Sequence, residues 1–243
     1  MLLLGAALYV WNFSSRASAQ NPDTIVVGNF SSGQQEDGLP LGWQPLAFDK
    51  IPQHTRYEMV NDNGVAVIKA QSRSAASGLV RNIEIDPHEY PIVEWRWKIE
   101  EVLTKGDARQ KKGDDYPARL YIFFAYDASL LSWSERVKYK AVRILSGEYP
   151  PGACITYIWG NRTEKGTIIA SPYTERSMMV VVQSGNSRAN TWVIEERNIL
   201  SDFREAFNAE PPMITGVAIM TDTDNTGESA TAWYGDIIFI GPH

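Results

Sequence analysis

The stretch RYEMVNDNGVAVIKA, residues 56–70, decides the fold class. Two runs, 56–60 and 65–70, carry apolar side chains with strand-like spacing, and Asn63-Gly64 lies between them. Asn-Gly between such runs is the strongest short-range signal for a β-hairpin, because both residues tolerate a positive φ. Residues 119–126 repeat the β pattern, with Leu120, Ile122 and Phe124 alternating against aromatic neighbours.

The rest of the chain is dominated by the same pattern. Further strands are expected at 25–27, 43–48, 78–85, 92–99, 153–159, 167–170, 178–183, 191–196, 215–221 and 233–240. Ser132 and Glu135 have capping-box spacing and open a helix that runs to about Leu145. A second helix is expected at 198–208, capped by Ser201. The sequence therefore predicts an all-β protein, mainly β with two short helices, folded as a single β-sandwich or jelly roll.

Composition narrows the functional classes. The 243 residues are 44% apolar and 21% charged, which is typical of a globular protein. The net charge of −6 argues against a uniformly basic surface, so no nucleic-acid partner is expected. Cys154 is the one cysteine, which excludes an intramolecular disulfide and cysteine-based metal centres.

The first residues predict the compartment. Leu2–Val10 is an apolar run too short to span a bilayer, and it leads to Ala17-Ser18-Ala19, a pattern that signal peptidase accepts. We expect residues 1–19 to be a signal peptide cleaved after Ala19, and 20–243 to form one periplasmic or secreted domain. No later stretch has the length and apolarity of a membrane helix, so no membrane span is expected after cleavage. The sequence leaves the oligomeric state open.

A hydrophilic segment, DTDNTGE at residues 222–228, is the sharpest candidate for metal binding. Oxygen side chains at alternate positions, Asp222, Asp224 and Thr226, precede a glycine, as in the first half of a calcium loop. The sequence therefore suggests Ca²⁺ as a cofactor. Two alternatives stay open: a loop whose polar side chains cap its own turn, and carboxylates that bind sugar hydroxyls or a cationic ligand.

A second acidic segment precedes a strand. Asp114 and Asp115 are adjacent, and neighbouring side chains on a regular strand point to opposite faces. A salt bridge to Arg119 is one interpretation. The other pairs one of these carboxylates with Asp222 or Asp224 as the acid and base of a glycoside hydrolase.

Aromatic and arginine side chains on strands are the third candidate. Trp95 and Trp97 share one face of the strand at 92–99, and Arg96 lies on the other. Tyr157 and Trp159 also share a face; they either stack on sugars or fill the core. Arg96, in an apolar strand, is expected to need a carboxylate partner or an anionic ligand.

Four stretches form a combined pattern: WRWK at 95–98, GDDYPAR at 113–119, IEERN at 194–198 and DTDNTG at 222–227. Together they resemble an uncharacterised bacterial family, domain of unknown function 3047. The two ends of the chain more loosely resemble the galactose-binding-like jelly rolls of carbohydrate-binding modules. That likeness implies pairing of the first and last strands, with calcium nearby.

Together these features predict an exported protein that binds a glycan or another extended polar ligand in an aromatic, arginine- and aspartate-lined cleft. The proposed ligand-binding residues are Arg96, Asp114, Asp115, Arg119, Tyr157, Trp159, Arg197, Asp222 and Asp224. Two alternatives are a carbohydrate-active hydrolase or lyase with paired carboxylates, and a structural protein of an envelope complex. We further expect the four family-like stretches to converge in space.

Overall fold

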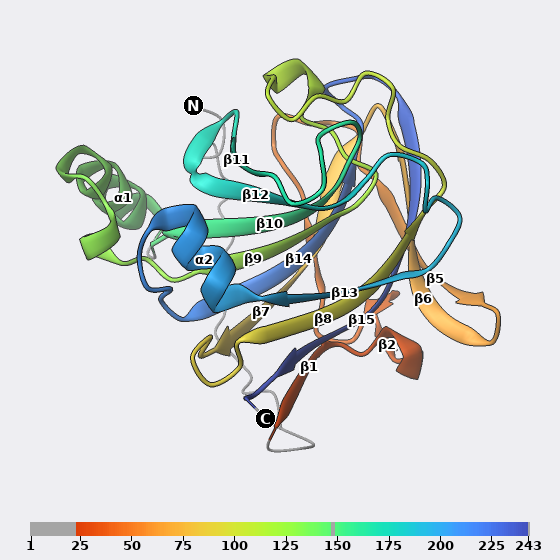
Figure 1. Ribbon diagram of the computed structural model, residues 1–243, viewed down its shortest axis with the longest axis horizontal. Coiled ribbons are helices and arrows are strands. Elements are labelled where there is room, and N and C mark those ends of the chain that lie inside the picture. The colour runs from red at the N-terminus through yellow and green to blue at the C-terminus, as the bar shows by residue number, and fades with distance from the viewer. Residues whose placement is uncertain (1–22, 147–148, 243) are drawn as a thin grey trace.

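Two facing β-sheets form the body of the molecule (Figure 1). The computed structural model describes residues 23–146 and 149–242. The six-stranded sheet has the order β13-β8-β15-β6-β5, with β1 also paired to β15, and the seven-stranded sheet has the order β11-β12-β10-β9-β14-β7-β4. The predicted all-β class and β-sandwich are therefore confirmed.

The elements follow the expected strands closely. The six-stranded sheet contains β1 (Thr24–Gly28), β5 (Arg56–Asp62), β6 (Val65–Arg73), β8 (Ile92–Ile99), β13 (Val193–Asn198) and β15 (Ser229–Ile240). The seven-stranded sheet contains β4 (Gln44–Leu46), β7 (Ala76–Ile85), β9 (Arg119–Phe124), β10 (Ala153–Gly160), β11 (Ile168–Ser171), β12 (Thr174–Ser184) and β14 (Ile214–Asp222). A small ribbon joins β2 (Gln35–Glu36) to β3 (Leu39–Pro40), and three short 3-10 turns lie at Phe30–Ser32, Lys111–Gly113 and Ala128–Leu130.

The hairpin predicted at residues 56–70 is β5–β6. Asn63 and Gly64 both adopt positive φ, 55° and 88°, as a tight hairpin turn requires. The first and last strands pair antiparallel, with Thr24 opposite Ile240. One pairing departs from the antiparallel pattern, because β10 runs parallel to β12.

Aromatic rings from both sheets meet in the core. Trp95 of β8 packs against Tyr157 of β10, with ring centres 5.0 Å apart, and Trp97 lies 5.9 Å from Trp159. All four side chains are buried. The core interpretation therefore holds for these rings, and the idea that Tyr157 and Trp159 present a surface to sugars is wrong, because neither ring reaches solvent.

Two helices accompany the sheets. In α1 (Trp133–Ser146) the predicted capping box is present: the Ser132 amide donates to Glu135 Oε2 at 2.8 Å, and the Glu135 amide donates to Ser132 Oγ at 3.4 Å. In α2 (Ile199–Phe207) the predicted cap is wrong. Asn198 is the N-cap, and its side chain accepts from the Ser201 amide, because the helix begins two residues before Ser201.

The N-terminal prediction lies outside this description. Residues 1–19, the expected signal peptide, are not among the described residues. Within 23–146 and 149–242, no helix has both the length and the apolar character needed to span a bilayer.

Candidate functional site

Two of the four family-like stretches meet at one end of the seven-stranded sheet. GDDYPAR leads into β9 and DTDNTG follows β14, and these strands pair antiparallel with Arg119 opposite Met220. The other two stretches, WRWK and IEERN, pair with each other as β8 and β13 of the six-stranded sheet. The stretches therefore converge as two pairs on different sheets and not as a single site.

Arg119 is the centre of the first pair. The residue is buried, with only 5% of its surface exposed. Its Nε donates to Asp222 Oδ1 at 2.8 Å, and a terminal nitrogen contacts both Asp222 Oδ2 and the Asp114 carbonyl. The Asp114 carboxylate lies 3.6 Å from the guanidinium, whose carbon is 4.4 Å from the centre of the Tyr116 ring.

The environment of this pair keeps Arg119 charged. Burial disfavours the charged guanidinium, but the neighbouring acidic groups, Asp222 foremost, together outweigh burial and raise the pKa of Arg119 above its usual value. The expected salt bridge between Arg119 and the acidic segment is therefore present. It is buried, so its loss leaves an uncompensated charge inside the protein.

Asp115 connects two loops that are far apart in the sequence, the one before β9 and the one after β14. Its Oδ2 accepts from the Thr226 amide at 2.6 Å, and its Oδ1 accepts from the Asn225 amide and side chain at 3.3 and 3.0 Å. The residue is completely buried. Asp115 thus holds the segment 222–227 against the start of β9, a role that the sequence alone did not indicate.

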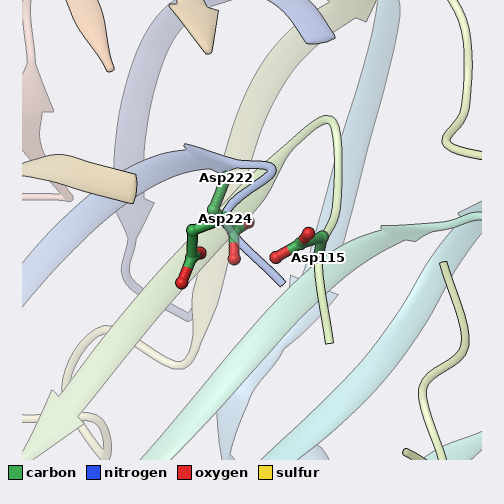
Figure 2. Close-up of side chains that lie close together, drawn as sticks. All are labelled: Asp115, Asp222 and Asp224. Carbon is green, nitrogen blue, oxygen red and sulfur yellow. The ribbon is translucent and has the colours of Figure 1, made fainter. Parts of the chain in front are cut away.

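The carboxyl groups of Asp115, Asp222 and Asp224 lie close together, as Figure 2 shows, and one oxygen of each lies within 4.8 Å of the others. Burial and then the charge of Asp115 raise the pKa of Asp224, and burial raises the pKa of Asp114. The predicted metal set was Asp222, Asp224 and Thr226. In the fold Asp115 joins Asp222 and Asp224, and the Thr226 hydroxyl accepts from the Glu228 amide at 3.4 Å. Calcium binding stays a prediction.

The second pair of stretches uses its polar groups internally. Trp97 Nε1 donates to Glu195 at 3.4 Å, and Gln183 donates to the same oxygen at 2.8 Å. Arg197 contacts Asp202 of α2, with its Nε donating at 3.0 Å, and Tyr157 donates its hydroxyl to that carboxylate at 2.7 Å. Arg197 and Tyr157, two predicted ligand-binding residues, therefore share a partner within the protein.

Arg96 differs from expectation. It is half-buried and lies on the outer face of the six-stranded sheet, since Trp95 and Trp97 occupy the core face of β8. Its guanidinium carbon lies 4.7 Å from the centre of the Trp192 ring. Within the described residues it has no hydrogen bond or ion pair. The expected carboxylate partner is therefore not bonded to Arg96, although the charge of Arg96 helps to lower the pKa of Asp62. The alternative, an anionic ligand, stays a prediction.

Gly235 gives Arg96 room to lie across β15. A Cβ at Gly235 would come within 2.4 Å of Arg96 Nε and 2.5 Å of its Cγ, which is closer than real Cβ contacts allow. The strand pairing between β15 and β8 also shifts between Tyr234 and Ile237. The position of Arg96 therefore depends on a glycine in the neighbouring strand.

Arg96 lies beside a group of side chains that the sequence analysis missed. We call this group, Trp192, Lys98, Trp233 and Lys69, the outer row. Trp233 pairs with Lys98 on one side and Lys69 on the other. Trp192 precedes Val193, the partner of Trp97, and so continues the row. Two interstrand spacings separate the tryptophans, about 10 Å.

Contacts order the outer row. Lys98 Nζ lies 5.1 Å from the Trp192 ring centre and 4.5 Å from that of Trp233. Asp62 joins the row, because it pairs with Lys98 at 2.6 Å and accepts from Trp192 Nε1 at 2.8 Å. Both tryptophans remain half-buried, so part of each ring faces solvent. Only the strand register shows that these residues are neighbours, and the register cannot be read from the sequence.

A shallow hollow lies where β6 and β15 pair, with a volume of about 300 Å³. It is lined by Gln71, Ser72, Arg73, Ser229, Ala230 and Thr231. None of the predicted ligand-binding residues lines it.

Fold and site together define a two-sheet β-sandwich with a buried arginine–carboxylate cluster at one end and an aromatic, basic row on one outer face. The chain belongs to the family described as protein of unknown function (DUF3047), whose model matches residues 41–238. All four of the stretches described above fall within that range. No curated protein matches the chain significantly.

Solved structures with similar arrangements are distant. A mutant of a family 29 carbohydrate-binding module is 12% identical, with 89% of each chain covered and a TM-score of 0.34. The cellulose induced protein Cip1 is 14% identical, with 86% of this chain and 94% of that one covered, at a TM-score of 0.35. A non-crystalline cellulose specific carbohydrate-binding module, CBM28, is 14% identical, with 85% of this chain and 88% of that one covered, at a TM-score of 0.33. Scores this low carry no argument about the ligand of this chain.

Proposed function

We propose that this chain is a non-catalytic carbohydrate-binding protein whose ligand lies on the outer face of the six-stranded sheet. The observation that supports the proposal is the outer row, in which two half-buried tryptophans flank Lys98, and Arg96 lies over one of them without a hydrogen bond or ion pair to any described residue. Export, expected from residues 1–19, is part of the same proposal.

The chemistry of the outer row suits a sugar chain. Aromatic rings stack on the apolar faces of pyranose rings, and the two tryptophans are about 10 Å apart across the strands. The guanidinium carbon of Arg96 lies 4.7 Å from the centre of the Trp192 ring, and the fixed fork of donors on an arginine binds a carboxylate or vicinal hydroxyls bidentately. Lys98, Lys69 and Asp62 supply further donors and acceptors along the same line.

The environment of the buried carboxylates indicates a structural role and not a catalytic one. Asp222 is engaged by Arg119, and both oxygens of Asp115 accept hydrogen bonds from the loop at 225–226. An acid and base of a hydrolase must reach the scissile bond in solvent-accessible substrate. Groups that hold two loops together and lie almost fully buried do not meet that requirement.

Affinity electrophoresis tests the proposal. The full chain is run through native gels that contain one polysaccharide each: hydroxyethylcellulose, xylan, dextran, alginate or polygalacturonate. We expect at least one polysaccharide to retard the wild type, and the double variant Trp192→Ala/Trp233→Ala to migrate as in an empty gel. Equal retardation of the wild type and the double variant would remove the outer row from the proposal.

A matched control separates the rings from the fold. Trp133→Ala removes an exposed tryptophan of α1 that lies outside both sheets, so its migration should follow the wild type in every gel. Urea unfolding of all variants identifies any that are destabilised. If no gel retards the wild type, the carbohydrate assignment itself is contradicted.

A further inference from the structure

Helix α1 carries an exposed apolar stripe. Trp133 is 79% exposed and Val137 is 50% exposed, and Ala141 one turn further on is also exposed. Residues spaced by four lie on one face of a helix, so these three side chains form a continuous line. Large apolar side chains exposed this far mark an interaction surface when they are contiguous.

Basic residues flank the stripe on both sides. α1 contains Arg136, Lys138, Lys140 and Arg143, all exposed, against a single acidic residue, Glu135. Helical spacing places Arg136 and Lys140 on one side of the stripe and Lys138 on the other. The helix is thus strongly basic within a chain whose net charge is −6.

The opposite face of α1 is fixed to the body. Glu135 pairs with Arg176 of β12 at 2.7 Å, and the buried Tyr139 donates its hydroxyl to the Pro151 carbonyl at 3.1 Å. The Tyr139 ring also packs on Tyr126, at 5.3 Å between centres. The contacts that dock α1 therefore leave the stripe turned away from the sheets, and Figure 1 shows the helix standing beyond their ends.

We propose that this face of α1 docks on the surface of an anionic phospholipid bilayer. A helix with basic residues around an apolar face that includes tryptophan lies in the plane of the interface. Tryptophan favours the headgroup level, and each lysine or arginine near an anionic surface adds attraction. The observation that selects a lipid surface over a protein is charge complementarity, since the basic groups border the stripe on both sides. This proposal is independent of the carbohydrate surface, which lies on the other sheet.

Vesicle flotation tests the docking. The full chain is mixed with vesicles of phosphatidylcholine alone or of equal parts phosphatidylcholine and phosphatidylglycerol. We expect flotation with the anionic vesicles only, and a loss of flotation as salt screens the surface. Lys138→Glu/Lys140→Glu should lower the partition coefficient by about 30-fold or more, taking about fivefold for each basic residue lost.

The apolar stripe has its own variant and control. Trp133→Ser/Val137→Ser should abolish flotation, whereas Leu41→Ser, which alters a side chain of similar exposure to Val137 (51%) on a distant turn, should not. The apolar run of residues 2–10 is common to all variants, so differences between them report α1. Circular dichroism verifies that each variant folds. If Trp133→Ser/Val137→Ser floats like the wild type, or changes only the oligomeric state in light scattering, the lipid assignment is wrong.

Discussion

Replacing Asp222 by Asn perturbs the buried cluster with almost no change of shape. The amide keeps one oxygen for Arg119 Nε or the Tyr116 amide, which donate to Asp222 Oδ1 at 2.8 and 3.2 Å. It removes the negative charge and one acceptor. Breaking a buried pair by removing one partner costs about 3–5 kcal/mol. Asp114 remains 3.6 Å from the guanidinium, so we expect the low end, about 3 kcal/mol.

Urea unfolding measures this loss directly. A destabilisation of about 3 kcal/mol is a large share of the roughly 5–15 kcal/mol typical of folded domains, and it appears as a lower midpoint with an unchanged slope. The double variant Arg119→Met/Asp222→Asn should recover part of the loss, since no charge is then left unpaired. Asp224→Asn is the matched control, two residues further on and without contact to Arg119. A loss below about 1 kcal/mol for Asp222→Asn, within the range of surface substitutions, would refute the reasoning.

Three further predictions concern the buried carboxylate cluster and the outer face of the six-stranded sheet. Because the pKa of Asp224 is raised, the folded state binds its proton more tightly and stability is lost as the pH rises through that pKa. Asp224→Asn should therefore raise Tm at pH 7 and leave it unchanged near about pH 4, the ordinary value for aspartate; an identical shift at both pH values would contradict this. Gly235→Ala should displace Arg96 from Trp192 and weaken polysaccharide retardation, while the control variant Trp133→Ala should not. Calcium added to the wild type tests the sequence-based cofactor prediction: a rise in Tm that Asp224→Asn abolishes supports it, and no rise in the wild type contradicts it.

Local patterns in the sequence were sufficient for most of the fold. The hairpin at 56–70 and the strand at 92–99 form as expected, because alternation and turn chemistry act between near neighbours. The alternation of β8 also placed Trp95 and Trp97 opposite Arg96. Whether the Arg96 face is covered depends on elements elsewhere in the chain, so the alternation alone did not show which groups surround Arg96.

The sites depended on contacts that no local pattern contains. Arg119 and Asp222 were both candidates from their motifs, and the pairing of β9 with β14 brings them together. The hydrogen bond from the Thr226 amide to Asp115 forms only because the two loops are adjacent in the fold. Trp192 and Trp233 lie 41 positions apart, and only the register through Lys98 joins them in one row. The order of the strands in the sheet thus brings side chains that are far apart in the sequence onto one surface.

The most direct test of the carbohydrate surface is a nuclear magnetic resonance titration that follows the indole N–H signals of the tryptophans. The ligand is an oligosaccharide of the polysaccharide that retards the protein most. We expect the signals of Trp192 and Trp233 to shift in a saturable way while those of the buried Trp95 and Trp97 stay in place. Saturable binding that leaves both Trp192 and Trp233 unshifted would contradict the account.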